Sequence, residues 1–223
     1  MTTPSTSLTA SAEDYLKAVY EIERRGAAAS TNDLAQELRV APASVSGMVR
    51  RLAEQGLLSH EPYRGARLTA AGRVAALRTI RRHRVLESYL VRALGYPWDR
   101  VHEEAERLEH AASDELVDRM AEAVGEPAVD PHGAPIPTRD GAMDERRRAS
   151  LAELEAGARG TVSRVRDEDG SLLRYLAELG IRPGAVVAVV DRAPFDGPIR
   201  LEVDGIERTV GTPVASTVLV EEE

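Results

Sequence analysis

Residues 30–56, "STNDLAQELRVAPASVSGMVRRLAEQG", decide the fold of the N-terminal part of this chain. The first eleven residues predict a short helix that starts at Ser30 or Thr31, because hydroxyl side chains cap helix N-termini. Pro42 suits the first position of a second helix, where its missing N–H costs nothing, and Gly56 ends that helix. Two short helices joined by a tight turn are typical of a helix-turn-helix.

The flanking sequence extends this pattern on both sides. Apolar residues at Leu16, Val19, Tyr20 and Ile22 recur at helical spacing and predict a helix over about 11–25. After Gly56, "LLSHEPYRGARLT" predicts two short strands around a turn at Arg64-Gly65. Helix, helix, turn, helix and two-stranded wing is the order of a winged helix-turn-helix.

The rest of the chain predicts a helical part followed by a β part. Thr69 is expected to cap a helix to about Ala93, and a second helix is expected from Asp99 to about Val124. Residues 125–142 are rich in Pro and Gly and predict a linker. Short strand-like runs and one helical piece, "SLLRYLAEL", then predict an SH3-like β-barrel. The expected class is mainly α with small β, with domains at 1–70, 71–142 (including the linker 125–142) and 143–223.

Composition limits the classes of protein that fit. The 223 residues include no cysteine, and neither a membrane-spanning apolar run nor a signal peptide is evident, which predicts a cytoplasmic protein without a membrane partner. The net charge is −8, yet residues 1–85 hold 13 basic and 8 acidic side chains, leaving 16 basic and 29 acidic ones. This asymmetry favours a DNA-facing N-terminal part and an acidic, cation-binding remainder.

The second helix of the helix-turn-helix has a face suited to DNA. Opposite its apolar side lie small residues and arginines, whose size permits close approach to a groove and whose polar groups reach bases or phosphates. The candidate DNA-binding residues are Ala43, Ser44, Ser46, Gly47, Arg50 and Arg51, with Arg64 in the wing. A glycine in mid-helix costs about 1 kcal/mol relative to alanine, so Gly47 indicates another surface close by. A packing unit that binds protein instead of DNA is the alternative.

The stretch "VHEEAERLEH", residues 101–110, places four metal-ligand types on one helical stripe. His102, Glu106, Glu109 and His110 stand at i, i+4, i+7 and i+8, so they share one face. The preceding helix offers a further i, i+4 pair, His83 and Glu87. Imidazoles with carboxylates suit Mn²⁺, Fe²⁺, Co²⁺ or Zn²⁺. A solvated charged face is the alternative explanation.

Asp14 has an ordinary explanation in the sequence. "SAED" fits a capping box with Ser11 as N-cap and Asp14 three residues later. From the local pattern alone, Asp14 is predicted to be a capping residue.

The whole chain resembles the diphtheria toxin repressor and manganese transport regulator family, including its iron-dependent members. The resemblance rests on "AEDYLKAVYEIE", "APASVSGMVRRLAEQGLL", "YRGARLTAAGR", "RRHRVLE", "VHEEAERLEH" and "DPHGAPIP", in order along the chain. The last third, with "LAELGIRPG", looks like the SH3-like domain of the longer members. The resemblance implies a homodimer formed through the helices around residues 86–120, and a palindromic double-stranded DNA operator that holds one or two dimers.

The resemblance also implies two metal sites. The primary site would use Asp14, Glu106, Glu109 and His110. The ancillary site would use His83, Glu87, His102 and a third-domain carboxylate, for which Asp169 fits best and Glu168 is the fallback. Asp14 thereby becomes a candidate ligand as well as a candidate cap.

Departures from the iron-type pattern bear on the choice of metal. Iron-type members usually carry methionine at the position of Asp14 and cysteine or methionine at that of Glu106, whereas this chain carries carboxylates, as the manganese-type members do. Replacing soft sulfur by hard oxygen favours Mn²⁺ over Fe²⁺. Lys17 stands where manganese regulators place a further glutamate, while His102 and the third domain match the iron-type layout. A two-site protein with manganese-type primary chemistry is expected, and Co²⁺, Zn²⁺ and Cd²⁺ are candidate substitutes in vitro.

The expected function is a Mn²⁺-dependent DNA-binding regulator that represses metal-uptake genes when metal is plentiful. An Fe²⁺-dependent repressor of the same family, or a winged-helix regulator that responds to a small organic ligand, are the alternatives. The chain contains no H-E-x-x-H, G-x-S-x-G or P-loop pattern, and an enzyme is not expected. A proline-rich peptide is a poor ligand for the β part, which holds only two aromatic residues, Tyr175 and Phe195.

Overall fold

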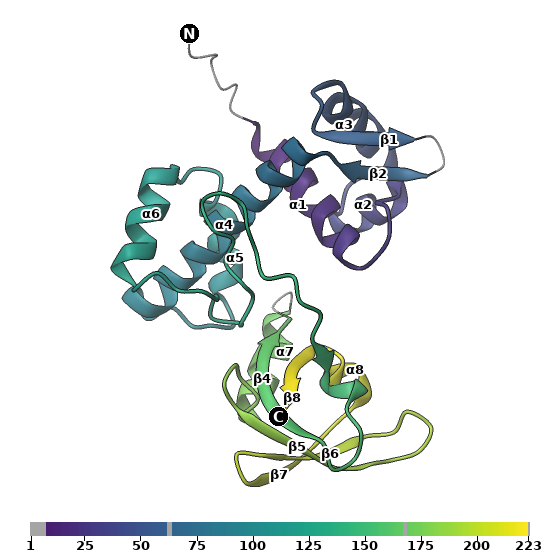
Figure 1. Ribbon diagram of the computed structural model, residues 1–223, viewed down its shortest axis with the longest axis vertical. Helices are drawn as coiled ribbons and strands as arrows, with labels where there is room; N and C mark the ends of the chain where they lie inside the picture. The colour runs from purple at the N-terminus through teal and green to yellow at the C-terminus, as the bar shows by residue number, and fades with distance from the viewer. Residues whose placement is uncertain (1–7, 62–63, 167–168, 223) are drawn as a thin grey trace. The chain divides into compact units, whose positions relative to one another are not determined.

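The computed structural model describes residues 8–61, 64–166 and 169–222 (Figure 1). The chain divides into two compact units, residues 1–82 with 137–142 and residues 83–136 with 143–223. One helix, α4 (Ala70–Leu94), runs through residues of both units. None of the described helices combines the length and the apolar character needed to cross a bilayer.

The N-terminal unit is built on three short helices, α1 (Ala10–Arg24), α2 (Thr31–Glu37) and α3 (Pro42–Glu54). Ser30 is the N-cap of α2: its hydroxyl accepts from the backbone N–H of Asp33 (3.1 Å), and the Asp33 carboxylate accepts from that of Ser30 (3.2 Å). Pro42 is the first residue of α3, as predicted. The fully buried side chains include Leu16, Tyr20, Leu34 and Leu52.

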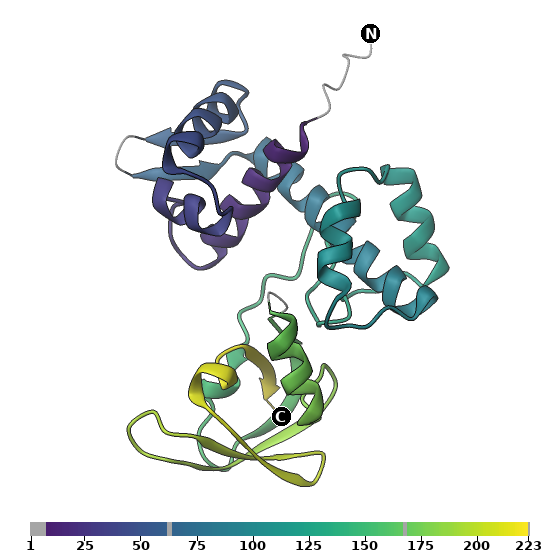
Figure 2. The same ribbon diagram turned by 180° about the vertical axis from the view of Figure 1, so that it is seen from behind.

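Two strands complete the winged helix-turn-helix. β1 (Leu58–Glu61) pairs antiparallel with β2 (Gly65–Leu68), and the pair lies beside α3 in Figures 1 and 2. Gly65 has φ of +83°, and a Cβ there would lie 2.8 Å from the carbonyl oxygen of Ala29, so this position needs glycine. The close approach lets Ala29 and Ala66 exchange backbone hydrogen bonds of 2.9 and 2.8 Å. The predicted winged helix-turn-helix fold is confirmed.

The helical part of the second unit contains the C-terminal half of α4 with α5 (Val101–Leu108) and α6 (Asp114–Ala123). The prediction of one helix from Asp99 to Val124 is wrong, because residues 109–113 separate α5 from α6. Ser113 starts α6, where its hydroxyl accepts from the backbone N–H of Leu116 at 3.2 Å. This helical part has a small hydrophobic core that consists of Val85, Val117, Ala121 and Ile136.

The predicted linker 125–142 has no helix or ladder strand, but its central part is folded and buried. Val129 forms an isolated bridge with Pro135, and the Asp130 carboxylate accepts from the backbone N–H groups of His132 (2.8 Å) and Ala134 (2.9 Å). Asp130 and His132 are both buried. Residues 128–136 are therefore an ordered turn without regular secondary structure, as the Pro- and Gly-rich composition predicts.

The C-terminal part is an antiparallel sheet, ordered β3-β8-β4-β5-β6-β7. The strands are β3 (Ala149–Ser150), β4 (Arg159–Val165), β5 (Val186–Arg192), β6 (Ile199–Val203), β7 (Ile206–Val210) and β8 (Val218–Glu222). A 3-10 turn (Leu151–Glu153) and the helices α7 (Gly170–Glu178) and α8 (Thr212–Ala215) accompany them. Every predicted strand and the predicted helix are present. Among the described strands, β3 and β7 end the sheet without pairing to each other, so it is open where a closed barrel was expected.

The C-terminal part contacts the helical part of its own unit at Trp98 and at residues 132–133. The Trp98 ring stacks on that of His132 with centroids 5.6 Å apart, and the Arg182 guanidinium lies 4.8 Å from the Trp98 centroid. Gly133 has φ of +87°, and a Cβ there would lie 2.0 Å from the carbonyl oxygen of Ser163 on β4. Only glycine permits this approach, so the turn of residues 128–136 is a contact point for β4.

Candidate metal centre and DNA-binding face

His83 lies at the centre of a network of imidazoles and carboxylates. On α4, His83 and Glu87 are one turn apart, and His83 Nε2 is 3.0 Å from Glu87 Oε1. His83 Nδ1 is 2.6 Å from Glu109 Oε2. All three side chains are buried. The imidazole thus bridges two carboxylates from different elements of the fold.

The helix α5 adds His102 and Glu106 at the rim of this network. His102 Nδ1 lies 3.1 Å from His83 Nε2 and 3.3 Å from Glu87 Oε1. Glu106 Oε1 is 3.8 Å from His83 Nδ1 and 3.9 Å from His102 Nε2. His83, His102 and Glu106 can each offer a ligand atom within 4.8 Å of the others. Because the Glu106 side chain is 43% exposed, the network opens to solvent on this side.

The residues after α5 continue the network. Glu109 is the C-cap of α5, and His110 Nε2 lies 3.5 Å from Glu109 Oε1. The stripe predicted on 102–110 and the pair predicted on α4 therefore meet in one connected group, here called the His83 cluster: His83, Glu87, His102, Glu106, Glu109 and His110. A solvated charged face does not explain the cluster, since Glu87 and Glu109 are fully buried.

The electrostatics of the His83 cluster suit a divalent cation. Burial raises the pKa of Glu87, but the charge of His83 and hydrogen bonds from His102 and His83 outweigh it and hold the pKa well below its usual range. Buried carboxylates need a compensating charge, which protonated imidazoles or a metal ion supply. The donors are nitrogen and oxygen only, a set that Mn²⁺, Fe²⁺ and Zn²⁺ accept. A metal ion would replace the protons now shared in these hydrogen bonds.

Two predicted ligands come from elements other than α4, α5 and the residues that follow α5. Asp14 is on α1 of the N-terminal unit, half-buried. The N-cap of α1 is Thr9, whose hydroxyl accepts from Ala12 N at 3.3 Å, so the capping box starting at Ser11 is wrong and Asp14 is inside the helix. Asp169 is the N-cap of α7 and accepts from the backbone N–H (2.8 Å) and hydroxyl (2.6 Å) of Ser171.

These hydrogen bonds from Ser171 and from the backbone of Leu172 lower the pKa of Asp169. No group of three converging metal ligands among the described residues includes Asp169. Capping explains its position, and its role as a metal ligand stays a prediction. The fallback, Glu168, lies outside the described residues.

The exposed face of α3 carries the predicted DNA-binding residues. Val45, Val49 and Leu52 are buried on the opposite side. All seven candidates are exposed: Ala43, Ser44, Ser46, Gly47, Arg50, Arg51 and, between the wing strands, Arg64. Arg50 is held by Glu54 at 3.0 Å along the helix. The α3 surface therefore combines small side chains with guanidinium groups, as contact with a DNA groove requires.

Replacing Gly47 by alanine is expected to stabilise the protein. A Cβ at position 47 would meet no atom within 4 Å, and alanine is about 1 kcal/mol more favourable than glycine inside a helix. Chemical denaturation should therefore show a free energy of unfolding about 1 kcal/mol higher. The same variant should bind DNA more weakly, because the added methyl group stands on the exposed face of α3.

Gly72→Ala is the matched helical control for this experiment. A Cβ at Gly72 would lie 1.9 Å from the carbonyl oxygen of Leu57, so this substitution should destabilise the protein. Equal effects of the two substitutions on the free energy of unfolding would contradict the assignment of Gly47 to an open surface.

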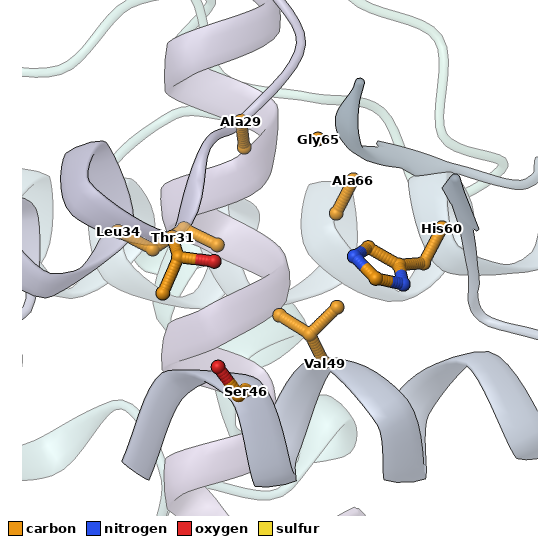
Figure 3. Close-up of a pocket in the computed structure, with 8 residues that line it drawn as sticks. All are labelled: Ala29, Thr31, Leu34, Ser46, Val49, His60, Gly65 and Ala66. Carbon is orange, nitrogen blue, oxygen red and sulfur yellow. The ribbon is translucent and has the colours of Figure 1, made fainter. Parts of the chain in front are cut away.

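A small pocket lies between α2, α3 and the wing (Figure 3). Its polar atoms come from Thr31, Ser46 and His60, and Val49 and Ala66 contribute apolar walls. The volume is about 60 Å³. Sites for small organic ligands usually occupy about 300–1,000 Å³. This pocket therefore offers little support for a regulator that responds to an organic ligand.

Sequence reasoning did not single out Asp130 and His132 as functional residues. Both are buried, and together with Glu87 they form a further group whose potential ligand atoms lie within 4.8 Å of one another. The signal was present in "DPHG", an Asp-x-His pair beside glycine, but the Pro- and Gly-rich composition led to the linker prediction.

Comparison with known proteins identifies all three parts of the chain. Residues 7–66 match the family profile "Iron dependent repressor, N-terminal DNA binding domain" and residues 69–138 match "Iron dependent repressor, metal binding and dimerisation domain". Residues 149–222 match "FeoA domain".

Individual relatives extend over nearly the whole chain. The iron-dependent repressor IdeR of Mycobacterium tuberculosis is 32% identical over 222 residues, covering 94% of this chain and 96% of that protein. The diphtheria toxin repressor of Corynebacterium diphtheriae is 30% identical, with the same coverage. A solved manganese-dependent transcriptional repressor in complex with manganese is 40% identical, with a TM-score of 0.88, and covers 95% of this chain and all of that one.

These relatives are transcriptional regulators, and the absence of an enzyme function is as predicted. With a DNA-binding domain, a metal-binding and dimerisation domain and a FeoA domain in order, this chain belongs to the iron-dependent repressor family of metal-dependent, DNA-binding transcriptional repressors.

Proposed function

We propose that this protein is a Mn²⁺-responsive repressor that binds a palindromic operator and reduces transcription of metal-uptake genes when metal is plentiful. The observation that carries the proposal is the His83 cluster, which joins three imidazoles and three carboxylates without a sulfur donor. Hard oxygen donors favour Mn²⁺ relative to sulfur-containing sites. The manganese complex of the 40% identical repressor supports the same choice.

The assignment of individual ligands is part of this proposal. Glu106, Glu109 and His110 would hold the primary ion with Asp14, and His83, Glu87 and His102 would hold the ancillary ion with Asp169. When bound, the ion supplies positive charge that offsets the carboxylates. A ligand from α1, within the DNA-binding unit, would link metal occupancy to DNA binding, and linkage requires that metal and operator each tighten the binding of the other. Asp14→Asn, with its metal affinity measured, tests the role assigned to Asp14.

A homodimer is the expected functional form. The matched metal-binding and dimerisation domain includes α4, α5 and α6, and Leu94, Leu108 and Leu116 on these helices are exposed. Exposed leucines on neighbouring helices favour burial against a second copy. Two DNA-binding units spaced by one turn of the duplex, about 34 Å, would match a palindrome.

The decisive experiment measures DNA binding with and without metal. Duplexes selected from a random library by the Mn²⁺-loaded protein are tested by gel retardation with EDTA, and then with Mn²⁺ restored. Binding should be lost with EDTA and regained with Mn²⁺. Equal retardation under both conditions would refute the metal response. The same titration with Fe²⁺ under anaerobic conditions decides between the two ions.

Arg51→Ala should reduce the salt dependence of operator binding. Arg51 is exposed on α3, and a phosphate contact releases about one counterion, so the slope of log K against log salt should fall by about 1. Binding at saturating Mn²⁺, measured from 50 to 200 mM salt as a typical range, gives the slope. Arg200→Ala, on β6 and paired with Asp191, is the control and should keep the wild-type slope. An unchanged slope for Arg51→Ala would remove this residue from the phosphate contacts.

A further inference from the structure

A second group of potential metal ligands lies on the other side of Glu87 from the His83 cluster. Glu87, Asp130 and His132 are 0%, 3% and 0% exposed, and each can offer a ligand atom within 4.8 Å of the others. Donor atoms around one transition-metal ion at about 2.1 Å are about 3–4 Å apart. The three side chains would therefore need to close by at most about 2 Å to share an ion.

The two carboxylate oxygens of Glu87 face different groups: Oε1 faces the His83 cluster and Oε2 faces His132. Oε1 takes part in the His83 cluster, at 3.0 Å from His83 Nε2 and 3.3 Å from His102 Nδ1. Oε2 is buried, accepts no hydrogen bond within the described part of the chain, and faces His132 Nδ1 at 3.9 Å. A fully buried carboxylate oxygen without a donor is costly, so this atom favours a cation beside it.

His132 is oriented so that one of its ring nitrogens faces Glu87. Its Nε2 lies 2.7 Å from the carbonyl oxygen of Trp98, and a carbonyl can only accept, so Nε2 carries the proton and donates it. A neutral imidazole protonated at Nε2 presents the lone pair of Nδ1, which is directed toward Glu87. Metal-binding histidines commonly donate their second N–H to a backbone carbonyl in this way.

Asp130 contributes a carboxylate whose orientation is already fixed. Oδ1 accepts from the backbone N–H groups of His132 and Ala134, which fixes the orientation of the carboxylate. Arg84 Nε lies 3.7 Å from Oδ2, while Arg84 Nη1 donates to the carbonyl oxygen of Pro135 at 2.6 Å. Arg84 offsets one negative charge, yet Glu87, Glu109 and Asp130 together bring three buried carboxylates to this region.

We propose that Glu87 Oε2, Asp130 and His132 form a separate site for a divalent first-row metal ion, sharing only Glu87 with the ancillary site proposed above. One imidazole and two carboxylates suit Mn²⁺, Fe²⁺ or Zn²⁺. The ion would fasten α4 to the turn of residues 128–136. This turn also holds β4, because Val165 N donates to the carbonyl oxygen of His132 at 2.8 Å. The site therefore ties the FeoA domain to the helix that carries His83.

Crystals of the full chain grown with Mn²⁺ provide the first test. Diffraction data above and below the manganese absorption edge should give an anomalous difference peak between Glu87 Oε2, Asp130 and His132. The wild-type protein is used, so the result does not depend on whether any variant folds. No peak at this position, with peaks at the His83 cluster, overturns the proposal.

Asp130→Asn provides the second test in solution. Asparagine keeps the oxygen that accepts from His132 and Ala134 but replaces the second oxygen by an N–H donor, which cannot bind metal. Equilibrium dialysis against Mn²⁺ with elemental analysis should show one ion fewer per chain than in the wild type. Asp140→Asn makes the same chemical change at an exposed position of the same segment and should keep the wild-type number. Equal stoichiometry in Asp130→Asn and wild type contradicts the site.

Discussion

Glu106→Ala should weaken Mn²⁺-dependent operator binding about 100-fold at limiting metal while leaving the protein folded. Glu106 Oε1 is within 4 Å of both His83 Nδ1 and His102 Nε2, and the side chain reaches solvent at the rim of the His83 cluster. Removing it takes one carboxylate from the donor set, so more Mn²⁺ is needed to reach the same occupancy. A partly exposed side chain contributes little to stability, and the melting temperature should stay near that of the wild type.

The measurement is a gel retardation series in which Mn²⁺ is titrated at fixed protein and DNA concentrations. Glu103→Ala is the matched control, since Glu103 is exposed on the same helix and belongs to no described group of metal ligands. This control should follow the wild-type curve. If Glu106→Ala and Glu103→Ala respond to Mn²⁺ alike, Glu106 is not a ligand.

Gly133→Ala should cost about 3 kcal/mol of stability and loosen the contact between the FeoA domain and the helical part of its unit. Two effects add. The φ of +87° is unfavourable for any residue with a Cβ, and that Cβ would lie 2.0 Å from the carbonyl oxygen of Ser163. Backbone atoms cannot move aside as a flexible side chain can, so the turn or β4 must shift.

Gly125→Ala separates the two effects. Gly125 has a similar φ of +81°, but a Cβ there would meet nothing within 4 Å. Chemical denaturation should show a loss of about 1 kcal/mol for Gly125→Ala, and the excess loss in Gly133→Ala measures the clash with β4. Equal losses in the two variants would mean that β4 does not rest on this turn in solution.

Local sequence patterns predicted the elements well where the chemistry is local. Ser30 with Asp33, and Thr69 before α4, mark helix starts through hydrogen bonds within four residues. Pro42 marks the start of α3 because it lacks the N–H that a first helical residue does not need. The His and Glu residues at i, i+4 spacing likewise predicted which side chains share a helix face. Helical periodicity alone, however, missed the break before Ser113, because apolar residues continue at helical spacing across it.

Local patterns could not predict which polar side chains are buried, or which potential metal ligands from different elements lie together. Asp130 is buried because residues 128–136 lie against α4, and His132 because Trp98 stacks on it; both contacts join segments more than 30 residues apart. The resemblance assigns Glu109 to the primary site and Glu87 to the ancillary site. In the structure, His83 contacts both carboxylates. The prediction for Asp14 failed for a local reason. Ser11 fits the pattern of an N-cap, but α1 begins two residues earlier, with Thr9 as its N-cap.

The side chains of the His83 cluster also determine how this cluster reacts with oxidants. Thiolate ligands pass through sulfenic and sulfinic acids when peroxide attacks them, and thioethers become sulfoxides. The chain contains no cysteine, and the His83 cluster consists of imidazole and carboxylate groups, which do not enter that series. Peroxide therefore finds no sulfur to modify in this cluster.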